Sequence, residues 1–375
     1  MIQKLSVPFE FPVIFTDHVF AAKNRTLVET LNRLRETHRH RCAIFLDENV
    51  VRRDGELCAR IQGYFAAHRE SLALAAPMQI VSGGEEAKND FSLVQKWCAQ
   101  MLDCRLDRHA FVIIGGGGAV LDAVGFAASL VHRGLRIVRV PTTVLAQSDG
   151  GVGVKTGVNF RGGKNALGTF APPFAVINDF QFLLTLADRE WRAGVAEAFK
   201  VAMIRDREFF AFLTANAEQF RLRDEPAMRR MVMRCAELHL EHIRTNGDPF
   251  EMGRARPLDF GHWSAHKLET MSSYKISHGD AVAIGILVDS IYASQRGWLD
   301  ESDVEKLRAG LAAAGFPQWF DELASEQIFD GLREFQEHLG GEMCITFPDG
   351  IGARREEHEI DLDAMRRAIA RLRAF

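Results

Sequence analysis

Amine and amide side chains stand close together in a glycine-rich stretch from Val140 to Gly168, which reads VPTTVLAQSDGGVGVKTGVNFRGGKNALG. The stretch contains Lys155, Lys164 and Asn165, and it is too polar for a core. Its glycines permit backbone conformations that other residues rarely adopt. Amines and amides on such a backbone suit an anion, and phosphate is the usual one. The stretch therefore predicts a phosphate-binding segment, with a solvated glycine loop as the alternative.

Three segments of the second half carry residue types that bind a divalent metal. Glu197 and Lys200 lie three residues apart in the apolar run GVAEAFK, where a charge is costly unless it has a partner. His262 and His266 are spaced to share one helix face, and His278 opens a very apolar helical run. One carboxylate and two imidazoles fit zinc with a position left open for substrate. Each histidine alone could instead be an ordinary core or surface side chain.

Short β-branched runs alternate with amphipathic helical runs in the first half of the chain. The strands are predicted at Ala43–Leu46, Met78–Val81, Ala110–Ile114, Arg136–Val140 and Ala175–Ile177. The helices between them are predicted at Arg25–His38, Asp90–Leu102 and Ala119–Val131. This alternation predicts a parallel sheet with helices on both faces, and such sheets bind ligands beyond the carboxyl ends of their strands.

Polar or glycine-rich segments follow three of these strands. Asp47, Glu48 and Asn49 come after the first, GGEEAK (83–88) after the second, and Gly116, Gly117 and Gly118 after the third. Glycines between a strand and a helix let backbone amides approach a pyrophosphate at the positive end of the helix. A tight strand–helix turn is the alternative for the glycines alone. The three segments together favour a dinucleotide site.

The second half is predicted to be helical. Helical periodicity runs through 189–205, 208–220, 227–243, 262–270, 278–296, 301–314 and 362–373. The change in composition near Leu184 predicts two domains, 1–184 and 185–375.

The overall composition limits the classes of partner and location. With 50 acidic and 46 basic residues, the chain has a formal charge of −4, which argues against nucleic acid or a membrane surface as a partner. Six scattered cysteines without a CxxC pair, and a first segment with no apolar signal core, predict a cytoplasmic protein with reduced thiols. The apolar stretch 110–131 is interrupted by glycines and Asp122, so we expect a strand, a turn and a helix rather than a membrane span.

Taken together, these motifs resemble the dehydroquinate synthase superfamily, the sugar phosphate cyclases. The resemblance runs from DEN at 47 to HGD at 278 and implies a Rossmann-like NAD-binding α/β domain followed by an all-helical metal-binding domain. It also implies a phosphorylated sugar substrate, NAD, and Zn²⁺ with Co²⁺ as an alternative metal.

The resemblance further implies a role for each matching residue. The metal ligands would be Glu197, His262 and His278, and the acid–base residue would be His266. The NAD contacts would be Asp47, Asn49, Glu85, Lys88, Gly116, Gly117, Gly118, Asp122, Thr142 and Thr143. The further substrate and cofactor contacts would be Asp149, Lys155, Lys164, Asn165 and Lys200. Arg133 would reach the phosphate bound by a neighbouring subunit, so we expect a homodimer.

The family chemistry that this implies has no net redox change. NAD transiently oxidises a secondary alcohol, phosphate is eliminated, the hydride is returned, and an intramolecular aldol step closes a carbocycle. The metal acts as a Lewis acid, and lysines stabilise the charge that develops on the leaving phosphate.

The chain departs from dehydroquinate synthases at three positions, two of which, a Lys and an Arg, help hold the substrate carboxylate in that family. His239 replaces a Lys, Asp259 replaces an Asn, and Ala255 replaces an Arg, with Arg254 and Arg256 on either side. These changes should weaken carboxylate binding. The segments GVGVKTGVNF and DFGH instead resemble cyclases of sedoheptulose 7-phosphate, although His266 is the dehydroquinate-type residue.

We therefore favour a cyclase of a sedoheptulose 7-phosphate type substrate. Three alternatives stay open: 3-dehydroquinate synthase proper, an NAD- and metal-dependent polyol dehydrogenase, and a non-catalytic paralogue.

Overall fold

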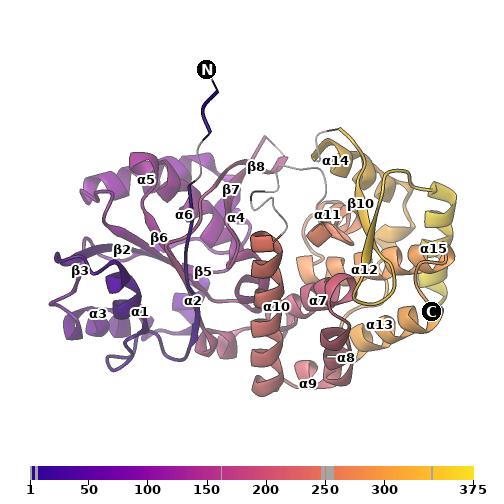
Figure 1. Ribbon diagram of the computed structural model, residues 1–375, viewed down its shortest axis with the longest axis horizontal. Coiled ribbons are helices and arrows are strands. Elements are labelled where there is room, and N and C mark those ends of the chain that lie inside the picture. Colours follow the sequence, from indigo (N-terminus) through magenta and orange to yellow (C-terminus); the bar gives the residue numbers. More distant parts are fainter. Residues whose placement is uncertain (1, 5–6, 162, 246–249, 251–256, 339–340) are drawn as a thin grey trace. The chain divides into compact units, whose positions relative to one another are not determined.

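The computed structural model describes residues 2–4, 7–161, 163–245, 250, 257–338 and 341–375. The chain divides into two compact units, Met1–Leu186 and Ala187–Phe375 (Figure 1). The predicted fold class, an α/β domain followed by a helical domain, is confirmed.

The first unit is built on a parallel sheet of seven strands in the order β1-β9-β6-β5-β2-β3, with β4 also paired to β2. The strands are β1 (Val13–Thr16), β2 (His40–Asp47), β3 (Leu72–Leu74), β4 (Gln79–Val81), β5 (Phe111–Gly116), β6 (Arg136–Pro141) and β9 (Ala175–Asp179). Because all pairs are parallel, the carboxyl ends of β2, β4, β5 and β6 share one edge of the sheet.

Helices cover both faces of this sheet (Figure 1). Alternate residues of β5 point to opposite faces: Val112 and Ile114 join one core, Phe111 and Ile113 the other. The first core is closed by α5 (Phe91–Asp103) and α6 (Gly118–Leu130), the second by α1 (Thr26–Leu31) and α3 (Leu57–Ala67). Two shorter helices, α2 (Glu48–Arg53) and α4 (Glu86–Asn89), follow β2 and β4.

From Lys155 on, the glycine-rich stretch forms an antiparallel hairpin, β7 (Lys155–Phe160) and β8 (Gly163–Phe170), and not the solvated loop that was the alternative to a phosphate-binding segment. Gly157 and Gly168 face each other in it. A Cβ at Gly157 would lie 2.8 Å from the carbonyl oxygen of Leu167, and one at Gly168 would collide with that of Thr156. These two glycines therefore permit a close approach of two strands.

The second unit is mainly helical. Its helices are α7 (Asp188–Arg205), α8 (Arg207–Ala215), α9 (Ala217–Arg221), α10 (Glu225–Thr245), α11 (His262–Met271), α12 (His278–Gln295), α13 (Glu301–Ala313), α14 (Asp330–His338) and α15 (Leu362–Ala374). α12 is buried on all sides from Gly279 to Ala293 and packs against α7, α11, α13 and α15. A small antiparallel sheet, β10 (Ile345–Pro348) with β11 (Arg354–Glu357), was not predicted.

The apolar stretch 110–131 forms β5 and α6, as expected. In the part of the chain that the structure describes, none of the helices combines the length and apolar character needed to cross a membrane.

Candidate metal centre and cofactor site

Glu197, His262 and His278 come together in the second unit from three different helices. Glu197 lies in the middle of α7, and the two histidines are the first residues of α11 and α12. Glu197 Oε1 is 3.1 Å from Nε2 of His278 and 3.5 Å from Nε2 of His262. One donor atom from each residue lies within 4.8 Å of the others. Two imidazole nitrogens and one carboxylate oxygen are a donor set for Zn²⁺.

The other ring nitrogens of the two histidines have partners that orient both rings. His262 Nδ1 is 3.1 Å from the carbonyl oxygen of Phe260, and His278 Nδ1 is 3.2 Å from Oε2 of Glu269. An Nδ1–H that donates to these oxygens leaves the lone pair on Nε2, the atom that faces Glu197. Metal-binding histidines in proteins are held in the same way by a carbonyl or carboxylate. The residues present therefore fit a divalent metal.

Glu197 is charged although it is buried. Burial disfavours the carboxylate, but the ammonium of Lys200 and the rings of His262 and His278 outweigh this and hold the pKa of Glu197 well below its ordinary value. Lys200 Nζ lies 2.5 Å from Glu197 Oε2. Burial also lowers the pKa of His278, but the two carboxylates beside it outweigh burial and raise it to about 9. Without metal, the His278 ring therefore keeps a second proton, on the Nε2 that faces Glu197, and a bound cation would replace that proton.

The structure describes some, but not all, of the other residues predicted for this site. His266 lies one turn after His262 on α11, with ring centroids 5.3 Å from His262 and 6.0 Å from His278. Asp259 is in a short turn, Pro257–Asp259, three residues before His262, and His239 lies on α10. Both are half-buried. Arg254, Ala255 and Arg256 lie outside the described residues.

Asp289 fixes the start of α11 from the neighbouring helix. It is fully buried on α12, where Oδ1 accepts a hydrogen bond from Trp263 Nε1 (2.9 Å) and Oδ2 from the amide of Gly261 (3.0 Å). Gly261 has a φ of +77°, and a Cβ there would lie 2.7 Å from the amide nitrogen of Ile286. The two hydrogen bonds flank His262 and hold its backbone.

The buried carboxyl group of Asp289 should make the free energy of unfolding depend on pH. Burial raises its pKa from 3.8 to about 7, although Trp263 and Gly261 donate to it. Between these values the folded chain keeps a proton that the unfolded chain releases. The stability from this group is therefore full below pH 3.8 and is lost as pH rises from there to about 7, by up to about 1.4 kcal/mol per pH unit.

We expect Asp289→Asn to lack this dependence and to be less stable at low pH, because one of the two N–H donors would face an amide NH₂. Urea unfolding at several pH values between 3.8 and about 7 measures the slope for both proteins. An equal slope in the variant would show that Asp289 does not titrate in this range.

The first unit gathers most of the residues predicted to bind NAD at the carboxyl edge of its sheet. Asp47 ends β2 and accepts a hydrogen bond from the amide of Asn49 (2.8 Å), and burial raises its pKa although Asn49 and Gly117 amides donate to it. A Cβ at Gly83 would collide with the side chains of Asp47 and Asn49. The end of β2 and the loop after β4 are thus in direct contact.

The amino end of α6 at this edge is open. A Cβ built at Gly118 would meet no atom within 4 Å, whereas one at Gly117 would touch Thr143 at 3.4 Å. Thr142 Oγ1 is buried and has no hydrogen-bond partner in the described residues. An open helix amino terminus beside an unsatisfied hydroxyl fits the pyrophosphate of a dinucleotide.

Lys88 links three segments at the same edge. It is buried, with Nζ 2.8 Å from Asp122 Oδ2 on α6 and hydrogen-bonded to Asn165 Oδ1 on the hairpin. Glu85 accepts a hydrogen bond from Asn159 of the hairpin at 2.8 Å. The tip of the hairpin is therefore tied to the loop after β4.

The predicted phosphate-binding donors are not all neighbours. Lys164 and Asn165 lie near the tip of the hairpin, whereas Lys155 begins β7 opposite Phe170. Lys155 is thus roughly 13 Å along the strand from the level of Lys164. Lys155 and Lys164 therefore lie at different levels of the hairpin, and their convergence on one phosphate stays a prediction. Asp149 lies in a single π-helical turn, Ala146–Gly150.

Arg133 is exposed and lies past the carboxyl end of α6. The helix separates it from Gly118 by about 20 Å, so this chain does not bring Arg133 to the carboxyl edge of the sheet. Its predicted role needs a second copy of the chain.

Two residues of the metal centre were missed from sequence, Glu269 and Asp289. Each had a signal: Glu269 is seven residues after His262, on the same face of α11, and Asp289 interrupts the apolar run AVAIGILVDSIYA. A carboxylate in such a place needs a buried partner.

Comparisons with family models and with known relatives indicate the same family. Family models described as 3-dehydroquinate synthase N-terminal and C-terminal match residues 78–193 and 194–335. A 3-dehydroquinate synthase of Campylobacter fetus subsp. fetus is 33% identical over 286 residues, 76% of this chain and 81% of that protein. A 2-epi-valiolone synthase of Actinosynnema mirum is 33% identical over 318 residues, covering 81% and 82%.

Among solved structures, ValA, a 2-epi-5-epi-valiolone synthase from Streptomyces hygroscopicus subsp. jinggangensis 5008 with NAD⁺ and Zn²⁺ bound, superposes with a TM-score of 0.89. It is 28% identical, and the alignment covers 100% of this chain and 99% of that one.

Proposed function

The chain belongs to the 3-dehydroquinate synthase family, and on that premise we propose that it is an NAD- and metal-dependent sugar phosphate cyclase. We propose a heptulose phosphate as substrate, with sedoheptulose 7-phosphate favoured, and phosphate elimination followed by aldol cyclisation as the reaction. The observation that carries the proposal is the meeting of Glu197, His262 and His278, with both Nε2 atoms turned toward the carboxylate.

In this proposal Glu197, His262 and His278 hold the metal, while Phe260 and Glu269 keep the two imidazoles in the required tautomer. When bound, NAD supplies reversible hydride transfer and the metal supplies Lewis-acid polarisation. His266 is half-buried beside both metal-binding histidines and can exchange a proton with the substrate. Lys200, 2.5 Å from Glu197, is placed to stabilise negative charge on the substrate.

The cofactor is assigned to the carboxyl edge of the first sheet. Gly116, Gly117 and Gly118 would receive the pyrophosphate, while Asp47, Asn49, Thr142 and Thr143 surround it. Lys88 holds Asp122 and Asn165 in place. We assign Glu85, Asp149 and Lys164 to the same set, and Lys155 and Arg133 to phosphate contacts, the latter from a second subunit of a homodimer.

The choice of substrate depends on His239 and Asp259. A substrate carboxylate would meet the negative charge of Asp259 and would lack the ammonium that lysine supplies at position 239 in dehydroquinate synthases. A heptulose phosphate without a carboxylate avoids both costs. The similarity to two valiolone synthases supports this choice.

The test is incubation of the enzyme with NAD, zinc and either sedoheptulose 7-phosphate or a carboxylated heptulosonate phosphate, with phosphate and NADH measured in parallel. We expect phosphate release from the first substrate without accumulation of NADH, and a cyclic product by mass spectrometry. NADH formed in equal amount with product would indicate a polyol dehydrogenase. Faster release from the heptulosonate would indicate 3-dehydroquinate synthase proper.

Exchanging the specificity residues should shift the preference. We expect His239→Lys with Asp259→Asn to raise kcat/KM for the heptulosonate phosphate by about tenfold or more, since one added charged hydrogen bond contributes about 1.5–3 kcal/mol. Steady-state kinetics on both substrates measure this, with Asp259→Asn alone as the control that removes repulsion without adding a donor. An unchanged preference in the double variant would place the carboxylate-binding determinant elsewhere.

A further inference from the structure

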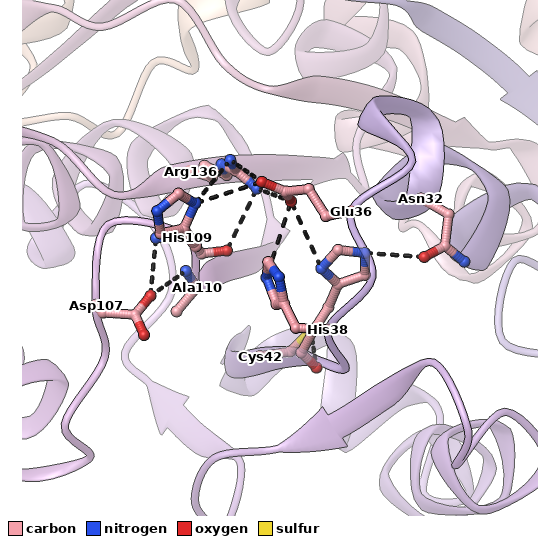
Figure 2. A network of polar contacts seen from close by, with 9 residues as sticks. Asn32, Glu36, His38, Cys42, Asp107, His109, Ala110 and Arg136 are labelled. Atoms are coloured by element: carbon pink, nitrogen blue, oxygen red, sulfur yellow. Dashed lines mark hydrogen bonds and ion pairs between the residues drawn. The ribbon is translucent and has the colours of Figure 1, made fainter.

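A second cluster of metal-binding side chains lies at the opposite edge of the first unit's sheet. It consists of Glu36 and His38, in the connection after the short turn Asn32–Leu34 (Figure 2), and of His40, the first residue of β2. β2 ends at Asp47, in the proposed cofactor set, about 23 Å along the strand from His40. The cluster is therefore separate from the cofactor residues at the carboxyl edge.

His40 is the buried member of this cluster, with 0% of its surface exposed. Its Nε2 lies 2.9 Å from the amide oxygen of Asn32, which can only accept, so Nε2 carries the proton and Nδ1 carries the lone pair. That Nδ1 is buried, has no hydrogen-bond partner among the residues that the structure describes, and points to Glu36 Oε2 at 4.0 Å. A buried lone pair without a donor fits a metal ion.

Glu36 and His38 complete the set of donors around the same point. The hydrogen bond from Arg136 lowers the pKa of Glu36 to about 2, so its carboxylate is ionised at neutral pH. His38 Nε2 is 3.9 Å from Glu36 Oε2, and its side chain is 49% exposed. One atom from each of the three residues lies within 4.8 Å of the others.

We propose that Glu36, His38 and His40 bind a divalent transition metal, Zn²⁺ by the chemistry of the donors. Tetrahedral zinc with bonds of about 2.0–2.1 Å holds its donors about 3.4 Å apart, so the three side chains must close by about half an ångström to one and a half ångströms. The half-exposed His38 is free to make most of that movement. A water on its solvent side is the fourth ligand.

Arg136 is the group that opposes cation binding here. It forms two hydrogen bonds to Glu36, at 2.6 and 2.8 Å (Figure 2). Its guanidinium also lies over the ring of Phe111. A carboxylate has about four lone-pair positions on its two oxygens, so Oε2 can accept from Arg136 and bind metal at once. Arg136 also lies 3.3 Å from Nδ1 of His109, which leaves His109 outside the set of ligands. The arginine orients the carboxylate and lowers the affinity for a cation.

The metal would link the connection after α1 to the first residue of β2. An ion that binds the folded chain and not the unfolded chain raises stability by mass action. The site is therefore structural, and its loss should leave the proposed catalytic residues in place.

The test is zinc stoichiometry by equilibrium dialysis of the chelator-treated full-length chain. We expect two zinc ions per chain in the wild type, one in His38→Ala, one in His262→Ala and none in the double variant. His358→Ala, which removes an exposed histidine of the second unit, is the matched control and should keep both. Circular dichroism checks that each variant is folded.

Zinc should also raise the melting temperature of His262→Ala by several degrees and leave that of the double variant unchanged. Equal stoichiometry in His38→Ala and wild type would overturn the proposal. One zinc ion in the wild type and none in His38→Ala would support it and would instead contradict the metal centre of the proposed function.

Glu36→Gln, which keeps the shape of the side chain, should weaken zinc binding at least tenfold in the His262→Ala background. Unchanged affinity would again overturn the proposal.

Discussion

His262→Ala should lose the metal and about 10³-fold of turnover, because it leaves two protein ligands and removes several kcal/mol of transition-state stabilisation by the Lewis acid. Metal content by atomic emission and phosphate release from sedoheptulose 7-phosphate measure the two effects. The ring of His262 is held by Phe260 and faces Glu197.

His266→Ala is the matched control for this result, since it removes the neighbouring imidazole one turn away on the same helix. We expect it to keep its metal while turnover falls by roughly 10²–10⁴-fold through loss of proton transfer. Full activity of His262→Ala, or of the wild type after treatment with a chelator, would contradict the assigned metal centre.

Lys200→Met should destabilise the metal-free protein by about 3–5 kcal/mol, because it leaves the buried carboxylate of Glu197 without its ammonium partner. Both side chains are almost fully buried, with 4% and 1% exposed, so solvent screens the pair little. In the zinc-loaded protein the cation provides the counter-charge, and the loss of stability should be much smaller. Urea unfolding with zinc and with a chelator measures the difference.

Lys306→Met is the control for this substitution, since Lys306 is 59% exposed in its ion pair with Asp303 and its removal should change stability by less than about 1 kcal/mol. An equal cost of Lys200→Met with and without zinc would show that the metal does not bind at Glu197.

The residues of the proposed metal centre could be named from sequence because helix periodicity is local. The spacing of His262 and His266, the charge of Glu197 in an apolar run and the helix opened by His278 all lie within one or two turns. The predicted ends of most long helices agree with the structure to within one or two residues. What periodicity could not show was the contact of Glu269 and Asp289 with these segments, since it depends on how α11 packs on α12.

The strands were harder to predict where short runs lack a continuous apolar pattern. β1 has four half-buried residues and β3 only three residues, so neither gives a strong signal. In the hairpin, the glycines of β7 and β8 suggested a loop, whereas they allow two backbones to approach. The cluster at Glu36 was overlooked for a related reason: two of its residues, Glu36 and His38, fall at the end of a predicted helix, 25–38, that in fact stops at Leu31.

The most direct test of the central claim is anomalous X-ray diffraction at the zinc absorption edge from crystals of the zinc-loaded protein. We predict a peak bonded to Glu197, to His262 Nε2 and to His278 Nε2, with bonds of about 2.0–2.2 Å. Full zinc occupancy elsewhere in the chain, with no peak among these three side chains, would contradict the account.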